Sequence, residues 1–231
     1  MNFDLIIQCR YQSSRLNAKI LLPIRQNLNS LDILIANFKS QKKIRKIILA
    51  VPQDEYAIIF KNIAIKYNIS FFSAKIDPNN VLKRFYMCAK KYKSQYVMRI
   101  TSDCAFINVH MVRNMMDEFQ KKKLNFLTNN FPRKIPHGFD CEIFSFNILE
   151  NIYKKAKSKY DKEHVTTWYR KNKKTFINQF NYYKENYSKI RLTLDYFEDY
   201  MNFVKNFDVY LKLSRMKYAE NTLKKINNKF I

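Results

Sequence analysis

Short apolar segments alternate with longer amphipathic segments through the first half of the chain. The apolar segments predict strands at residues 3–10, 44–51, 69–73 and 95–100. Helical spacing of apolar positions predicts helices at residues 30–41, 54–67, 78–93 and 109–122, the first with Ser30 as its N-cap. Strands and helices that alternate in this way are typical of βαβ units, so we expect a parallel sheet covered on both faces.

The pattern changes after residue 123. Strands are predicted at residues 125–130 and 141–146, on either side of a loop that holds two prolines and the only glycine of the chain, Gly138. We expect Gly138 to occupy a position that needs a positive φ or a close backbone approach. Further on, the pattern predicts helices at 147–157 and 161–171, strands near 176–183 and at 189–195, and a helical tail.

The loop after the first strand reads RYQSSRLNAK and holds three cations and two hydroxyls. Ligands of open α/β sheets bind beyond the carboxyl ends of the strands, so residues 11–19 and 101–108 are the expected site. Guanidinium forks, an ammonium group and hydroxyls suit a polyphosphate. A basic surface loop in a lysine-rich protein would look the same. The glycines of a Walker loop or a dinucleotide fingerprint are absent.

Two predicted strands end in an aspartate, Asp103 in RITSD and Asp195 in RLTLD. Mg²⁺ binds in proteins through one or two carboxylates together with substrate phosphates, so these residues are candidate metal ligands. Each is equally compatible with capping a turn or a helix. His164, in EHVT, is a candidate substrate contact or a structural histidine.

Composition narrows the class of protein. The chain has 231 residues, of which 47% are apolar and 16% aromatic, and this excludes a disordered chain. We expect a single domain without a membrane span or signal peptide, and a cytoplasmic location. The net charge of +24 and the single glycine are both consistent with a coding bias toward AT-rich codons. The four cysteines form no CxxC pair and the three histidines are scattered, so a zinc site is not expected.

Six segments in order resemble the cytidylyltransferases that activate sugar acids. RYQSSRLNAKILLPI is similar to their opening pattern R-(Y/M)-x-S-(T/S)-R-L-P-G-K-x-L. The other five are NNVLKRFYMCAKKY, RITSDCAFIN, FPRKIPHGFDCEIFSFNIL, DKEHVTTWYRKN and IRLTLDYFEDYMNFV. The resemblance is strongest to the spore-coat-polysaccharide-type branch, next to the acylneuraminate and 3-deoxy-manno-octulosonate enzymes, and extends to about residue 207.

The resemblance implies a nucleotide-diphospho-sugar-transferase-like fold, a three-layer α/β/α sandwich with a mostly parallel, mixed sheet. It divides the single domain into a nucleotide-binding half (1–123), an acceptor-binding half (124–207) and a helical tail (208–231). The implied reaction moves CMP from CTP to an acceptor oxygen and releases pyrophosphate, with Mg²⁺. The acceptor is a sugar acid or a small phosphorylated compound destined for a surface polysaccharide.

The resemblance also implies roles for individual residues. Arg15, Lys19 and Asp103 are the implied catalytic residues, and Asp103 and Asp195 the implied ligands of Mg²⁺. The implied nucleotide-binding residues are Arg10, Ser13, Ser14, Arg15, Lys19 and Arg84. The residues expected to face the acceptor are Asp140, Glu142 and His164. Relatives often pair through segments of the second half, so a homodimer is compatible with the resemblance; no membrane or specific nucleic-acid partner is expected.

The chain departs from the family pattern at several loop positions. Asn17 and Ala18 replace the family's P-G, Gln12 and Ser102 each replace a glycine, and residues 79–80 are asparagines where carboxylates are usual. Three alternatives therefore stay open: a glycosyltransferase of similar fold, a basic nucleic-acid-binding protein, and a non-catalytic nucleotide-binding relative. The Asp-x-Asp motif usual in the first is absent, and the lysines are not gathered as the second requires.

Overall fold

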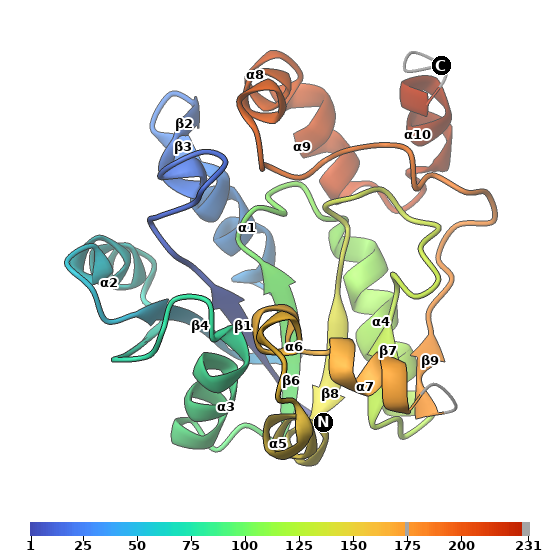
Figure 1. Cartoon of the computed structure of the whole chain (residues 1–231). Helices are drawn as coiled ribbons and strands as arrows, with labels where there is room; N and C mark the ends of the chain where they lie inside the picture. The colour runs from blue at the N-terminus through green and yellow to red at the C-terminus, as the bar shows by residue number, and fades with distance from the viewer. Residues whose placement is uncertain (174–175, 228–231) are drawn as a thin grey trace.

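A mixed sheet forms the centre of the molecule. The computed structural model describes residues 1–173 and 176–227, and within them seven strands lie in the order β5–β4–β1–β6–β8–β7–β9. Strands β1, β4, β5 and β6 are mutually parallel, whereas β8 is antiparallel to both β6 and β7 (Figure 1). The bounds are β1 Phe3–Gln8, β4 Ile44–Pro52, β5 Ser70–Ala74, β6 Tyr96–Thr101, β7 Phe126–Thr128, β8 Glu142–Ser145 and β9 Asn178–Gln179. The predicted mostly parallel, mixed sheet is confirmed.

Helices cover both faces of this sheet, as Figure 1 shows. Leu5 and Ile7 of β1 belong to one core, with α1 (Ser30–Phe38), α2 (Ala57–Tyr67) and α4 (Val109–Lys121). Ile6 belongs to a second core, with α3 (Val81–Lys91), α5 (Phe146–Lys155) and α7 (Thr167–Asn172). Successive strand residues point to opposite faces, so a continuous apolar strand supplies both cores. The predicted three-layer sandwich is therefore confirmed.

Several local predictions are wrong. The N-cap of α1 is Asn29, whose side chain accepts from the backbone N–H of Asp32 at 2.9 Å, rather than Ser30. The predicted helix at 161–171 is divided into α6 (Lys159–His164) and α7 at Val165, which has a φ of 58°. Residues 189–195 form no strand but only an isolated parallel bridge between Arg191 and His137. Near 176–183 the only described strand is the short β9.

The remaining described elements lie beyond the carboxyl ends of the central strands. A short helix, η1 (Lys19–Leu21), leads into a small hairpin of β2 (Pro23–Arg25) and β3 (Leu28–Asn29) that the pattern did not predict. Helix α8 (Phe197–Lys205) precedes the predicted helical tail, in which the structure has α9 (Phe207–Arg215) and α10 (Glu220–Asn227). Residues 228–231 of that prediction lie outside the described residues. Figure 1 shows α8 and α9 on the same side of the sheet as the hairpin.

Gly138 meets both conditions predicted for it. Its φ is +96°, and a Cβ at this position would lie 1.9 Å from the carbonyl oxygen of Leu192. The backbone of residues 137–138 therefore passes directly against residues 190–193. Two hydrogen bonds tie the segments together, from His137 N to Ile190 O at 2.9 Å and from Leu192 N to His137 O at 2.7 Å.

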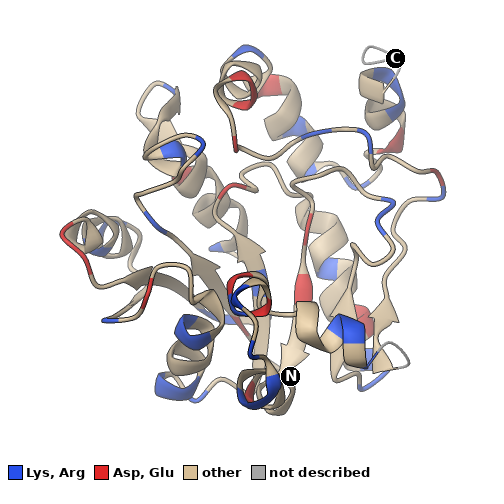
Figure 2. Cartoon of the chain, viewed as in Figure 1, with Lys and Arg blue, Asp and Glu red and all other residues tan. Residues whose placement is uncertain are grey.

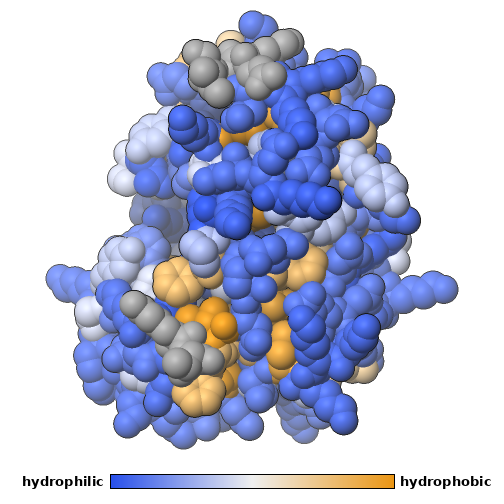
Figure 3. Space-filling model, turned by 90° about the vertical axis from the view of Figure 1, so that its right-hand side faces the viewer, coloured by the Kyte–Doolittle hydropathy of each residue, from blue (hydrophilic) through white to orange (hydrophobic). Residues whose placement is uncertain are grey.

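The surface is strongly basic and mainly hydrophilic. Figure 2 shows Lys and Arg distributed over helices of both layers rather than gathered on one element. The face in Figure 3 is dominated by hydrophilic residues, with apolar residues gathered in its lower half. None of the helices in the described residues has the length and apolar character needed to cross a membrane.

Candidate active site

The site lies where the strand order reverses. The chain moves from β1 outward to β4 and β5, then returns to β6 on the other side of β1, which leaves a crevice at the carboxyl ends of β1 and β6. A cavity of about 280 Å³ opens there. Its lining includes both predicted loops, and a neighbouring cavity of about 580 Å³ shares Arg10, Ser13, Ser14 and Glu163 with it.

Lys19 joins the two predicted metal carboxylates. Its Nζ donates to Asp103 Oδ2 at 3.0 Å and to Asp195 Oδ1 at 2.8 Å. Arg15 donates to the same oxygen of Asp195. The ammonium group of Lys19 is well shielded, with 13% of the side chain exposed. The structure therefore brings together the four residues expected to hold the leaving group and the metal.

The charges in this cluster stabilise one another. Burial by itself would lower the pKa of Lys19, but the carboxylates of Asp103 and Asp195 outweigh it and hold the pKa above its ordinary value. Burial would likewise raise the pKa of Asp195, but hydrogen bonds and charge from Lys19 and Arg15 hold it below. At neutral pH Lys19 and Asp195 are therefore both ionised.

Asp195 is placed by irregular backbone. The N–H of Leu194 donates to the carbonyl of Asp103 at 3.1 Å, which couples the two carboxylate segments directly. Arg191 Nη2 donates to Asp195 Oδ2 at 3.1 Å, and Asp199 holds Arg191 while accepting from the backbone N–H of Asp195 at 2.9 Å. Sequence reasoning assigned no role to Arg191 or Asp199, although both lie in the last resembling segment.

Arg10 spans the two cavities. Its Nη1 donates to Asn79 Oδ1 at 2.8 Å, and its Nη2 lies 3.9 Å from Glu163 of α6. Asn80 caps α3, because its side chain accepts from the backbone N–H of Lys83 at 3.1 Å. Both asparagines therefore keep the acceptor oxygen that a carboxylate would supply at these positions.

Arg84 is a buried cation that lines the smaller cavity. Only 1% of the residue is exposed, and Nη1 donates to the carbonyl of Pro78 at 3.2 Å. Its Nε has no hydrogen-bond partner, and no ion pair involves it among the described residues. Burial lowers the pKa of Arg84 to about 10, so the guanidinium is charged at neutral pH. A buried charge without a counterion marks a place for an anion.

The three residues expected to face the acceptor differ in position. His164 lines the smaller cavity. Asp140 is paired with Arg133 and accepts from the backbone N–H of Gly138 at 3.2 Å. Glu142 does not face the cavity as expected: it is 1% exposed and accepts from Arg99, Arg170 and Thr166. Three donors from neighbouring elements, the buried Thr166 and the partly buried Arg99 and Arg170, turn this carboxylate inward.

The replaced glycines have different consequences. Ala18 adopts the left-handed conformation, with φ 51° and ψ 17°, which a glycine adopts at no steric cost. Gln12 is not among the described residues with positive φ, so its backbone does not require glycine. Its side chain lines the neighbouring cavity instead.

The donor set is compatible with Mg²⁺. In the described part of the chain, no three His, Cys, Asp or Glu side chains lie close enough together to hold a metal ion. Asp103 and Asp195, however, supply two hard carboxylates at one point through their shared contact with Lys19. Mg²⁺ prefers one or two such carboxylates and takes its other ligands from phosphates and water.

Three hydrophilic residues that line the cavity, Gln8, Arg99 and Glu163, were neither predicted site residues nor part of the two predicted loops. Gln8, Arg99 and Thr101 extend from the same face of β1 and β6 into the cavity. Arg99 and Thr101 are two residues apart on β6, and strand residues two apart share a face. Counting back two residues from Thr101, at the start of the predicted loop, could therefore have identified Arg99.

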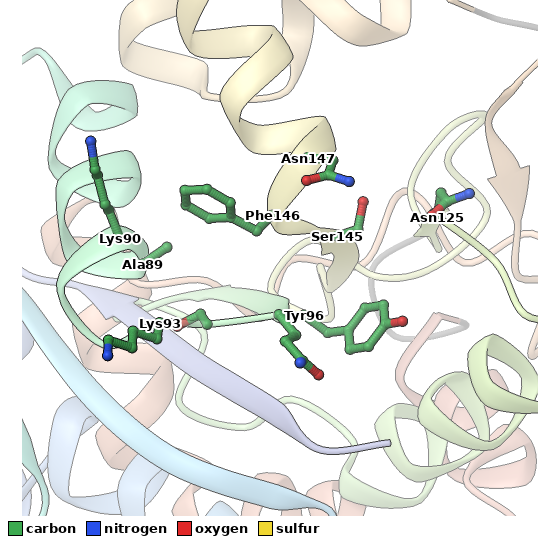
Figure 4. A pocket seen from close by; sticks show the side chains of 10 residues that line it. Ala89, Lys90, Lys93, Tyr96, Asn125, Ser145, Phe146 and Asn147 are labelled. Carbon is green, nitrogen blue, oxygen red and sulfur yellow. The ribbon is translucent and has the colours of Figure 1, made fainter.

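A larger cavity of about 490 Å³ lies at the other end of β6, between the end of α3 and the start of α5 (Figure 4). Its cations are the lysines Lys90 and Lys93, and its lining contains no carboxylate. The buried hydroxyl of Ser94 is already committed, because it donates to Asp4. This cavity therefore lacks the groups that phosphoryl transfer requires.

Known proteins resemble this chain along nearly its whole length. Residues 5–227 match the sequence profile of the family described as cytidylyltransferase. The chain belongs to the cytidylyltransferase family. It is thus a CTP-dependent nucleotidyltransferase, as the motifs implied.

Two individual proteins are similar to this chain in sequence over most of its length. An uncharacterized protein of Methanocaldococcus jannaschii is 32% identical over 212 residues, which cover 88% of this chain and 84% of that protein. The spore coat polysaccharide biosynthesis protein SpsF of Bacillus subtilis is 28% identical over 204 residues, 84% of this chain and 82% of SpsF.

Solved structures show the same fold. A cytidylyltransferase from Leptospira borgpetersenii superimposes with a TM-score of 0.87 at 27% identity, covering 99% of this chain and 94% of that one. A CMP:2-keto-3-deoxy-manno-octonic acid synthetase complexed with CTP gives a TM-score of 0.69 at 12% identity, over 90% of this chain and 99% of that one.

Proposed function

We propose that this cytidylyltransferase moves CMP from CTP to a small anionic acceptor, a sugar acid or a small phosphorylated compound, and that the product serves surface polysaccharide synthesis. The observation that carries the proposal is the contact of Lys19 with both Asp103 and Asp195 beside a cation-lined cavity. The similarity to SpsF, whose name gives a role in spore coat polysaccharide biosynthesis, supports the pathway. We expect the reaction to occur in the cytoplasm.

Different residues of the two cavities bind different parts of CTP. Ser13 and Ser14 lie where the two cavities meet, so they hold the phosphates together with Arg10 and Arg15. The guanidinium of Arg84, whose Nε has no hydrogen-bond partner, binds a further oxygen of the nucleotide. The neighbouring cavity, lined by Asp54 and Pro78 among others, has room for the nucleoside.

Catalysis follows from fixed positive charge. An acceptor oxygen bonds to the α-phosphorus while the bond to the β-phosphate oxygen breaks, and the electron pair leaves with pyrophosphate. Lys19 and Arg15 neutralise the charge that develops on this leaving group. Because they are held before the reaction by Asp103 and Asp195, little reorganisation is needed. A hydroxyl acceptor releases its proton, whereas an ionised phosphate has none to release.

Asp103 and Asp195 would hold Mg²⁺ together with phosphate oxygens. When bound there, Mg²⁺ supplies charge neutralisation and orientation of the phosphates. The two carboxylates accept hydrogen bonds from Lys19, so this side chain orients both of them.

A pyrophosphate-release screen tests the proposal. Four nucleoside triphosphates are combined with a panel of sugar acids and phosphorylated metabolites, with and without Mg²⁺. We expect release only with CTP, only with Mg²⁺ and only with an anionic acceptor. Turnover of a neutral sugar in place of every anion on the panel would contradict the proposed acceptor class, and release that is independent of Mg²⁺ would contradict the metal assignment. Size-exclusion chromatography of the same preparation tests whether the chain forms a homodimer.

A further inference from the structure

Arg99 is a cavity cation to which neither the motifs nor the proposed triphosphate contacts assign a role. It extends from β6 on the face that carries α3 and α5, two residues before Thr101 in the strand. Its Nη1 donates to Glu142 Oε2 at 2.8 Å, while its Nε is buried with no partner. A buried N–H donor without a partner is costly unless a ligand completes it.

Both carboxylate oxygens of Glu142 already accept hydrogen bonds. Besides Arg99, the carboxylate accepts from Thr166 Oγ1 at 2.7 Å and from Arg170 Nη2. Arg170 also has a buried Nε without a partner. Two guanidiniums share one carboxylate, so this cluster retains an excess positive charge. The nearby Asp140 does not compensate it, because Asp140 pairs with Arg133.

A strained turn fixes this cluster beside the cavity. Val165 is fully buried, with φ 58° and ψ −62°, and the N–H of Thr166 donates to the carbonyl of His164 at 2.6 Å. This is a γ-turn with positive φ, which is rare for any residue and more so for a β-branched one. It directs His164 to the cavity and Thr166 to Glu142. Such strain persists where the surrounding structure fixes it, commonly at functional sites.

Arg99 lines the smaller cavity but not the neighbouring cavity of about 580 Å³. That larger space is lined by the loop after β1, by residues at the end of β4 and before α3, and by Glu163 of α6. Arg99 instead pairs with Glu142 of the neighbouring strand β8. The acceptor must approach the α-phosphorus from the side away from Lys19 and Arg15, which hold the leaving pyrophosphate. Arg99 of β6 and His164 of α6 both line this cavity outside the loop that holds Lys19 and Arg15.

We propose that Arg99, oriented by Glu142, binds the anionic group of the acceptor, a carboxylate or a phosphate, next to His164. This inference rests on the proposed function. Arg99 touches the substrate, whereas Glu142, Arg170 and Thr166 are positioning residues that keep its guanidinium directed into the cavity. Burial lowers the pKa of His164, so a neutral imidazole faces the same group as a hydrogen-bonding partner.

Anion binding to the nucleotide complex tests the inference without knowledge of the acceptor. The protein is saturated with α,β-methylene-CTP and Mg²⁺, then titrated with methyl phosphate or with acetate by calorimetry. We expect the wild type to bind one of the two, and the choice identifies a phosphate or a carboxylate acceptor. Arg99→Gln should weaken this binding by about tenfold or more while the dissociation constant of α,β-methylene-CTP stays within about threefold of wild type.

Two further variants control for structural damage. Arg99→Gln leaves Glu142 with one cation fewer, so the Arg99→Gln/Glu142→Gln double variant removes both charges and should show the same loss of anion binding. Arg45→Gln is the matched control, since Arg45 pairs with the buried Asp4 at the far end of β1 and lines neither site cavity. It should bind both ligands as the wild type does.

Three outcomes would overturn the inference. Both anions could bind Arg99→Gln as tightly as wild type, or neither could bind the wild type. Arg99→Gln could also lose the nucleotide analogue to the same extent as the anion, which would assign Arg99 to the triphosphate. Failure of the wild type to bind α,β-methylene-CTP at all would instead refute the proposed function.

Discussion

The segments that hold Lys19 and Asp195 reach the same point by different means. Residues 10–19 fold on themselves: Ala18 N donates to Tyr11 O at 3.0 Å, and Ser13 N donates to Asn17 Oδ1 at 3.2 Å. Residues 189–195 instead depend on distant partners, with Leu192 bonded to His137 and Leu194 to Asp103. One side of the site is thus specified locally, whereas the other depends on the assembled fold.

The largest effect is expected where the two segments meet. Lys19→Ala removes the cation that both aspartates contact, and it should reduce kcat/KM for pyrophosphate release about 1,000-fold or more, equivalent to about 4 kcal/mol. Asp103→Asn should have a similar effect. Arg25→Ala is the control, because Arg25 lies on the adjacent hairpin and pairs only weakly with exposed Asp208. Wild-type turnover in both site variants would refute the proposed mechanism.

Gly138→Ala should displace residues 189–195, the segment that depends on distant partners, and leave residues 10–19 in place. The new Cβ would lie 1.9 Å from Leu192 O, so the two backbones must separate. We expect the free energy of unfolding to fall by about 3 kcal/mol or more, measured by urea denaturation, and activity to fall because Asp195 moves away from Lys19.

Asn68→Ala separates the close approach from backbone strain. Asn68 also has a positive φ, 49°, but it ends α2 far from the site. Its replacement should cost only about 1 kcal/mol. If Gly138→Ala lowers the free energy of unfolding no more than Asn68→Ala does, the close contact with Leu192 does not constrain residue 138. That result would contradict the structure.

The same contrast explains what the sequence could predict. The loop after β1 was identified because a short strand, a cation-rich turn and a helix lie within one stretch of sequence. Asp195 was also selected, first as the end of a predicted strand and then through the family resemblance, but its local structure was predicted wrongly. Residues 189–195 alternate as a strand does, yet their partners, His137 and Asp103, lie on separate loops and leave no room for a ladder.

The inward position of Glu142 could not be predicted from its motif. Its partners Arg99, Thr166 and Arg170 come from β6 and from the segment after α6, and no periodicity connects these positions. A polar residue at the start of a strand is ordinarily expected to be accessible. The γ-turn at Val165 is likewise imposed by packing, since a β-branched residue disfavours it.

Acidification should weaken the nonlocal side of the site. The pKa of Asp195 is lowered because Lys19 and Arg15 outweigh the effect of burial. A carboxyl whose folded pKa lies below its unfolded value, about 3.9 for Asp, stabilises the fold above that value. The contribution is lost as pH falls through the folded pKa. Urea denaturation between neutral pH and pH of about 3 should therefore show a smaller acid-induced loss for Asp195→Asn than for wild type. Identical pH profiles would show that Asp195 is not coupled to Lys19 in solution.

The smallest expected effect concerns the local segment. Ala18 holds a left-handed conformation immediately before Lys19, and an L-residue with a Cβ pays a steric penalty of about 1–2 kcal/mol for it. Ala18→Gly removes that penalty but gives the unfolded chain more freedom, so we expect a net gain of about 1 kcal/mol or less. Thermal denaturation measures the gain, and CTP affinity should be unchanged because no side-chain contact is lost. A large rise in turnover would mean instead that the alanine constrains Lys19, and that the missing glycine weakened catalysis rather than stability.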